Sequence, residues 1–164
     1  MAESYETMPE LEEDSQKGRF LTFVIGKETY GIEIRYVTEI IGLQDITEMP
    51  DMPDYLKGII NLRGTIIPVM DVRLRFGKQP RNYDDRTCII VIDCGVVAVG
   101  LTVDSVSEVL TLPEQDIAEL PGIGGRQNGG YIKNVGKAGD TVILIIECEK
   151  LLSAQDLKRL AAEP

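Results

Sequence analysis

Few residues of this chain are suited to chemistry, because histidine is absent altogether. Without an imidazole there is no Ser-His-Asp triad, no Cys-His pair and no histidine ligand for a metal. The three cysteines, Cys88, Cys94 and Cys148, lie in or beside apolar runs and at no metal-ligand spacing, which is typical of small buried hydrophobic residues. An odd, unpaired set of cysteines also indicates a reducing compartment.

The remaining candidates do not form a catalytic constellation. Asp84-Asp85 lies in a polar linker and Glu12-Glu13 in the N-terminal tail, where a catalytic acid would not be desolvated. The glycine-dense segment 121–130 is followed by predicted strands, whereas a phosphate-binding loop opens a helix. The sequence therefore predicts no enzyme, no cofactor and no metal site.

Two charged residues stand inside otherwise apolar, strand-rich segments. Glu39 belongs to a Val-x-Glu-Ile segment, and Arg63 lies at the tip of an Asn-Leu-Arg-Gly turn. Each is either a solvated side chain or a protein contact, since arginine combines planar hydrogen bonding with a weakly hydrated face. A third alternative is that Glu39 and Arg63 pair with one another. The sequence leaves these alternatives open.

The net charge of −10 is unevenly distributed. Residues 1–17 hold six acids and one base, which predicts a solvated, disordered acidic leader. The rest of the chain is also acidic, which argues against nucleic-acid binding. A local basic segment is interpreted most simply as a solvated linker, and its members are Arg73, Arg75, Lys78, Arg81 and Arg86. No signal peptide or membrane span is visible, so we expect a cytoplasmic protein without membrane insertion.

From residue 20 onward the pattern is one of about ten short strands. Residues 20–25 and 29–34 flank a Gly-containing loop, and residues 58–62 and 65–72 flank Arg63-Gly64, so both pairs predict hairpins. Pro68 cannot donate to a sheet ladder, which places its part of the strand at an edge or a bulge. The chain is therefore expected to be all-β.

An internal repeat appears when residue n is set against residue n+69. The offset pairs Gly31 with Gly100, Val37 with Val106 and Glu39 with Glu108. It predicts two β modules of roughly 65 residues that bury apolar surface against each other. We expect lobe 1 at about 18–86, lobe 2 at about 87–147 and a short amphipathic C-terminal helix at about 149–162, after the capping box that begins at Ser153.

The stretch 57–76, KGIINLRGTIIPVMDVRLRF, strongly resembles the signature of the CheW family of chemotaxis coupling proteins, and the match extends over about residues 18–155. The resemblance implies a CheW-like domain over residues 18–164, with two five-stranded SH3-like barrels and no enzymatic activity. It also implies a cytoplasmic scaffold at receptor arrays on the inner face of the membrane. The implied partners are the regulatory domain of the histidine kinase CheA, the cytoplasmic tip of chemoreceptors and other CheW-like domains in rings.

The resemblance also implies which residues contact partners or support the contact surfaces, namely Val37, Glu39, Gly58, Arg63, Gly64, Gly100 and Val106. We expect an apolar groove between the lobes that includes Val37 and Val106. The alternative function is a small-molecule-binding β module that uses the interlobe cleft.

Overall fold

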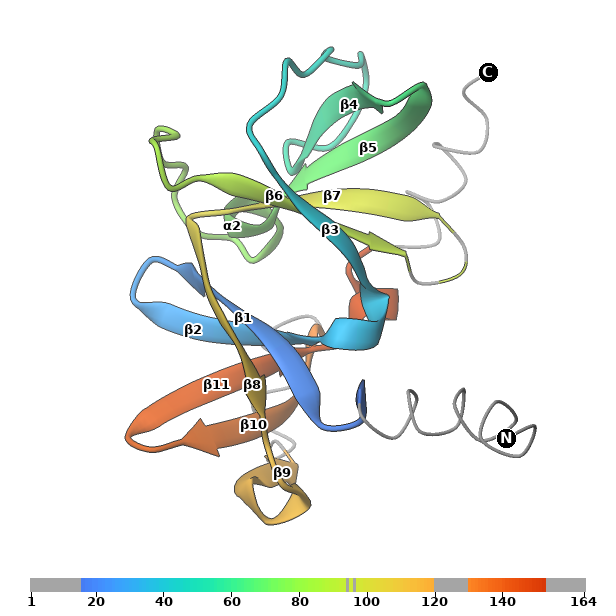
Figure 1. Cartoon of the computed structure of the whole chain (residues 1–164). Helices are drawn as coiled ribbons and strands as arrows, with labels where there is room; N and C mark the ends of the chain where they lie inside the picture. Colours follow the sequence, from blue (N-terminus) through green and yellow to red (C-terminus); the bar gives the residue numbers. More distant parts are fainter. Residues whose placement is uncertain (1–15, 94, 96, 120–129, 153–164) are drawn as a thin grey trace, which may run out of the picture.

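The computed structural model describes residues 16–93, 95, 97–119 and 130–152 (Figure 1). The described chain is built from strands, as predicted, with helical structure limited to one short α-helix and single 3₁₀ turns. The strands are β1 (Arg19–Ile25), β2 (Glu28–Glu33), β3 (Val37–Gly42), β4 (Leu56–Leu62), β5 (Thr65–Asp71), β6 (Cys88–Asp93), β7 (Ala98–Val103), β8 (Ser105–Thr111), β9 (Ile117–Glu119), β10 (Ile132–Ala138) and β11 (Thr141–Ile146). The helical elements are η1 (Ile34–Tyr36), α2 (Val72–Arg75), η2 (Glu114–Asp116) and η3 (Cys148–Lys150).

The two ends of the chain are described only in part. Residues 1–15 of the predicted acidic leader and residues 153–162 of the predicted C-terminal helix lie outside the described residues. The last described segment contains η3 and ends at residue 152. No helix in the described part of the chain is long and apolar enough to cross a membrane.

The strands form two sheets, each of which is one lobe of the molecule. Lobe A has the strand order β8-β1-β2-β11-β10-β9, and lobe B has the order β3-β6-β7-β5-β4. The lobes do not follow the predicted division into segments 18–86 and 87–147, because β3, β4 and β5 share one sheet with β6 and β7. Lobe A also carries β9, a three-residue strand beyond the predicted five. In Figure 1, β3 leads from η1 into lobe B, and β8 leads from the end of β7 into lobe A.

The repeat explains this exchange of strands. Each module contributes its first hairpin to one sheet and its remaining strands to the other, so β1, β2, β3, β4 and β5 correspond to β6, β7, β8, β10 and β11. The parallel pairs are equivalent too, since Gly31 of β2 lies opposite Ile145 and Gly100 of β7 lies opposite Val69. The two modules are joined through their sheets as well as through their side chains.

The two hairpins predicted from the sequence are confirmed. Strands β4 and β5 meet at Arg63 and Gly64, whose φ values of 52° and 89° are those of a two-residue turn with both residues left-handed. Pro68 pairs with Ile59 of β4, and β5 pairs with β7 only from Val69 onward. The side of β5 that faces β7 is therefore unpaired at Pro68, which agrees with the expected edge position.

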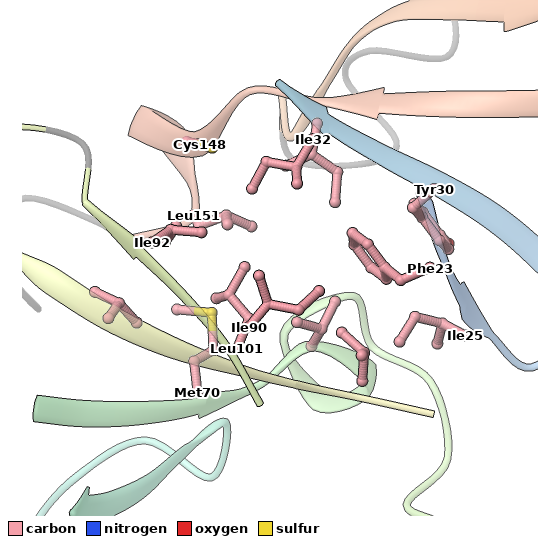
Figure 2. Packing of buried hydrophobic residues seen from close by; sticks show 14 of the residues in the cluster. Phe23, Ile25, Tyr30, Ile32, Met70, Ile90, Ile92, Leu101, Cys148 and Leu151 are labelled. Atoms are coloured by element: carbon pink, nitrogen blue, oxygen red, sulfur yellow. The ribbon is translucent and has the colours of Figure 1, made fainter. Parts of the chain in front are cut away.

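Alternation along the strands divides the apolar side chains among three clusters. In β6, Ile89 and Val91 point into lobe B, whereas Ile90 and Ile92 point toward lobe A. Lobe A has its own interior cluster, which includes Phe20. Figure 2 shows the cluster between the lobes, in which Phe23, Tyr30 and Ile32 of lobe A share one space with Met70, Ile90 and Leu101 of lobe B. The predicted burial of one module against the other is confirmed.

Candidate partner-binding site

The Glu39–Arg63 pair connects the two edges of lobe B. Strands β3 and β4 stand at opposite ends of the sheet order, yet Nη2 of Arg63 donates to Oε2 of Glu39. The contact is an ion pair between side chains that are 28% exposed for Glu39 and 70% exposed for Arg63. Of the alternatives that the sequence left open, the intramolecular pair is the one present. A partner that approaches this edge meets both charges together.

The turn that presents Arg63 is held by its own residues. The amide of Gly64 donates to Oδ1 of Asn61 at 2.8 Å. A Cβ on Gly64 would meet no atom within 4 Å, but its positive φ is a conformation that side chains rarely adopt. Gly64 therefore supports the turn that carries Arg63 through its backbone conformation.

Gly58 supports the same edge by allowing close approach of the backbone. Thr47 and Ile59 exchange two backbone hydrogen bonds of 2.9 Å across Gly58. A Cβ on Gly58 would lie 2.1 Å from the carbonyl oxygen of Thr47, and φ of Gly58 is 145°. The buried Gly58 is a supporting residue, since it offers no side chain to a partner.

Gly100 is also a packing position. It is buried in β7, and a Cβ would lie 2.8 Å from Cγ2 of Ile89 in the interior of lobe B. The equivalent Gly31 of lobe A meets Cγ2 of Ile143 at 2.9 Å in the same way. A side chain at Gly100 would therefore act through the packing and shape of lobe B.

Val37 and Val106 occupy equivalent places on the two strands that cross between the lobes. Both are half-buried against the interlobe cluster. Val37 shares β3 with Glu39, whereas Val106 lies on β8 in lobe A. The structure thus brings Val37, Glu39 and Arg63 together on lobe B and places Val106 on the other lobe.

Sequence reasoning missed a set of exposed apolar side chains. Ile40 of β3 is 45% exposed and its equivalent Val109 of β8 is 42% exposed. Ile66 of β5 and Val142 of β11, each the second residue after a hairpin turn, are both 58% exposed. Each lobe therefore exposes one apolar residue on its crossing strand and one beside its hairpin. Comparison of the two repeats, restricted to outward-facing strand positions, would have found them.

Between the lobes, the described apolar side chains pack into one cluster. A hollow of about 160 Å³ lies at its edge, lined by Tyr30, Phe76 and the Lys78–Glu28 ion pair among others. Ligand pockets commonly measure about 300–1,000 Å³, so this hollow is small for a metabolite. A larger one of about 590 Å³ lies over β10 and β11 on lobe A. Neither hollow supports the alternative of a small-molecule site in an interlobe cleft.

The described residues contain no cluster of three or more His, Cys, Asp or Glu side chains that could hold a metal ion. Neither Cys88 nor Cys148 forms a disulfide bond with a described residue, and burial raises the pKa of Cys88. A raised pKa makes a thiol a poorer nucleophile at neutral pH. The exposed apolar side chains and the exposed Glu39–Arg63 pair suit the class of two-lobed β proteins that bind other proteins.

Comparison with known proteins agrees with that class. The CheW-like domain family matches residues 19–156, so the chain belongs to this family. A chemotaxis protein CheW from Klebsiella aerogenes is 36% identical over 92% of this chain and 91% of its own length. A probable chemotaxis protein CheW from Rhizobium etli is 35% identical over 81% and 86%. The crystal structure of the scaffolding protein TtCheW from Thermoanaerobacter tengcongensis superposes with a TM-score of 0.79 at 32% identity, over 85% of this chain and 94% of that one.

Proposed function

We propose that this chain is a non-enzymatic scaffold that couples chemoreceptors to the histidine kinase CheA in bacterial chemotaxis. Membership of the CheW-like family and similarity to a scaffolding protein support the assignment. The observation that carries it is the occurrence of equivalent exposed apolar positions, Ile40 with Val109 and Ile66 with Val142, on two lobes of one body. Such an arrangement suits a protein that must hold two partners at once.

Coupling by this scaffold needs no chemistry in the scaffold itself. Two modest interfaces on one body become strong together, because the second contact forms at a high effective concentration. Control of the kinase is then a shift between assembled states that bind the scaffold differently. We place this assembly in the cytoplasm, at receptor arrays on the inner face of the membrane, where other CheW-like domains join it in rings.

The predicted site residues divide into two kinds in this proposal. Contact residues offer a side chain at the surface, and supporting residues shape the backbone behind it. The contact residues are Val37, Glu39, Arg63 and Val106, and the supporting residues are Gly58, Gly64 and Gly100. Arg63 carries most weight, because it is the exposed charge at the tip of a rigid hairpin.

The test is co-sedimentation of the full chain with receptor-containing membranes and purified CheA. We expect Arg63→Glu to weaken recruitment of the kinase by about tenfold or more, equivalent to about 1.4 kcal/mol. The matched control is Arg86→Glu, because Arg86 is exposed on lobe B and its side chain has no contact among the described residues. Equal recruitment by both variants would remove Arg63 from the interface, and no recruitment by the wild type would refute the function.

A further inference from the structure

The chain crosses from one lobe to the other at two points in its described part. It passes from β2 to β3 through η1, and from β7 to β8 through the single residue Asp104. A crossover of one residue restricts movement of the lobes only if that residue is itself held. The contacts of Asp104 therefore bear on how firmly the two lobes are oriented.

Asp104 is the most highly connected carboxylate of the described chain. Its side chain is 10% exposed, and it accepts from Nε of Arg73 at 3.0 Å, from Nη1 of Arg81 at 3.0 Å and from the amide of Gly26 at 2.7 Å. Gly26 belongs to the β1–β2 turn of lobe A, whereas Arg73 and Arg81 follow β5 of lobe B. One carboxylate thus joins both lobes at the point where the chain crosses.

The ionised form of Asp104 is favoured at neutral pH. Burial by itself raises the pKa of this carboxyl group, but the hydrogen bonds from Arg73, Gly26 and Arg81 outweigh burial and lower the pKa below its ordinary value. Charge-assisted hydrogen bonds of this kind are short and directional. They define a geometry, which apolar contact alone does not.

The segment that carries Arg73 and Arg81 also reaches lobe A elsewhere. The guanidinium of Arg75 stacks on Tyr131 of lobe A, 4.8 Å from the ring centroid, and Nε of Arg75 donates to the carbonyl of Leu151. Phe76 contacts the same Tyr131 with ring centroids 5.4 Å apart. Nζ of Lys78 lies 2.7 Å from Oε1 of Glu28 on β2. The basic segment is therefore not a solvated linker, because Arg75 and Lys78 contact lobe A and both Arg73 and Arg81 contact the crossover residue Asp104.

The interlobe cluster alone leaves the orientation under-determined. Burial of apolar surface is non-directional and scales with area, so two packed sheets gain similar energy at neighbouring angles. Fixed polar contacts across the interface favour one of these angles, in the way that a single buried polar residue fixes the register of some coiled coils. Residues 72–81, which we name the interlobe clasp, provide such contacts at several points.

We propose that the interlobe clasp, anchored on Asp104, fixes the relative orientation of the two lobes and so sets the geometry in which their partner-binding faces are presented. Asp104 is in this proposal a positioning residue that touches no partner. The orientation itself is independent of any partner, whereas its consequence for coupling rests on the function proposed above.

The test is the measurement of backbone residual dipolar couplings on the intact, isotopically labelled protein. In the wild type we expect one alignment tensor to fit the amides of both lobes. In Asp104→Asn we expect the single-tensor fit to be lost while each lobe still fits its own tensor. The matched control is Asp85→Asn, since Asp85 is exposed in the α2–β6 connection that also carries Arg81, makes no hydrogen bond or ion pair with the described residues, and should keep the single fit.

A folded Asp104→Asn variant that keeps one tensor and the wild-type interlobe angle would overturn the proposal. If Asp104→Asn does not fold, Arg81→Gln removes one arm of the network and leaves the contacts of Arg73 and Gly26 in place. Loss of the single-tensor fit in Arg81→Gln then supports the clasp, and an unchanged fit overturns it.

A second measurement separates the clasp from the proposed function. We expect Asp104→Asn to bind receptor membranes and CheA singly as the wild type does, while receptor control of the kinase falls by about tenfold, within the usual range of coupling between sites. If Asp104→Asn shows separate alignment tensors but receptor control of the kinase is unchanged, the consequence for coupling is refuted. Absence of binding by the wild type would refute the proposed function and leave the dipolar-coupling result standing.

Discussion

Lobes A and B share one topology and backbone pairing at the closing edge, but lobe B adds a side-chain ion pair there. In lobe B the Glu39–Arg63 ion pair joins the edge strands. The equivalent positions in lobe A are Glu108 and Gly139, so no such pair forms there. Backbone pairing joins the edges of both lobes, through β9 and β10 in lobe A and through the single Thr47–Ile59 bridge in lobe B. Lobe B therefore has less backbone pairing at this edge and adds an exposed ion pair beside it.

This difference separates the functions of the two edges. A backbone-paired strand is insensitive to the charge of an approaching protein. An exposed ion pair, in contrast, can open and pair with charges on that protein at a small cost in free energy. Exposed pairs contribute about 0.2–1 kcal/mol to stability. The closing pair of lobe B therefore suits recognition better than it suits stabilisation, which agrees with the role proposed for Arg63.

The largest expected effect is a loss of stability at the register shift of β4, where the equivalent substitution in β10 should cost little. Gly58 lies opposite Val69, as Asn134 lies opposite Ile145, each just after a shift in register. We expect Gly58→Ala to destabilise the protein by about 3 kcal/mol or more, because a Cβ there clashes with the backbone of Thr47 and φ is strained.

Asn134→Ala is the matched substitution in lobe A, with an expected loss of less than about 1 kcal/mol. Urea denaturation followed by circular dichroism measures both. Equal losses of stability in the two variants would show that the close approach of the Thr47 backbone to position 58 does not require glycine.

A smaller effect concerns the two crossovers, where Asp104 and Arg35 occupy equivalent positions. We expect Asp104→Asn to cost about 2 kcal/mol at pH 7, because it breaks charge-assisted hydrogen bonds to two arginines. Arg35→Gln should cost less than about 0.5 kcal/mol, since Arg35 is exposed and its contacts lie on the surface.

The cost of Asp104→Asn should also depend on pH. The folded-state pKa of Asp104 is lowered, so its stabilisation is fully present above the ordinary value of 3.8 and is lost as the pH falls through the lower folded value. Urea denaturation at a series of pH values from 7 downward checks this. A difference between wild type and variant that stays constant down to pH 2.5 would contradict an ionised Asp104 in the folded state.

The smallest expected effect on stability compares Glu39 and Glu108, which occupy equivalent positions on the edge strands of the two lobes. Glu39→Gln should lower the free energy of unfolding by about 0.5 kcal/mol, and Glu108→Gln by about zero, because only Glu39 has a cation partner among the described residues. In co-sedimentation with CheA we expect Glu39→Gln to change recruitment and Glu108→Gln to leave it unchanged. Matching behaviour of the two variants would mean that the closing pair has no role in recognition.

Local features of the fold were predictable from the sequence. The Arg63-Gly64 turn and the edge character of Pro68 follow from short-range patterns, and the recurrence of Gly31 as Gly100 follows from the repeat at an offset of 69 residues. The division into lobes was not predictable in this way. Nothing in the repeat states whether β3 pairs within its own module or with the other one, because the same alternation of apolar residues suits both.

The candidate site was predictable in part. Glu39 and Arg63 were identified as charges within apolar segments, but their pairing depends on lobe B curling until its edge strands meet. The basic segment was misread because a run of cations signals solvent when its partners are distant in sequence. Asp104 lies 31 residues from Arg73 and 23 from Arg81, beyond any local pattern.

By itself the sequence determined the all-β class, the repeated module, the hairpin turns and the absence of histidine chemistry. These properties depend on residue type and on spacings of a few residues, which local sterics and alternation express directly. Only the tertiary structure decided the exchange of strands between lobes, the closing pair of lobe B and the interlobe clasp. Each of these depends on contacts between residues far apart in the chain, whose energies exist only after both sheets have formed.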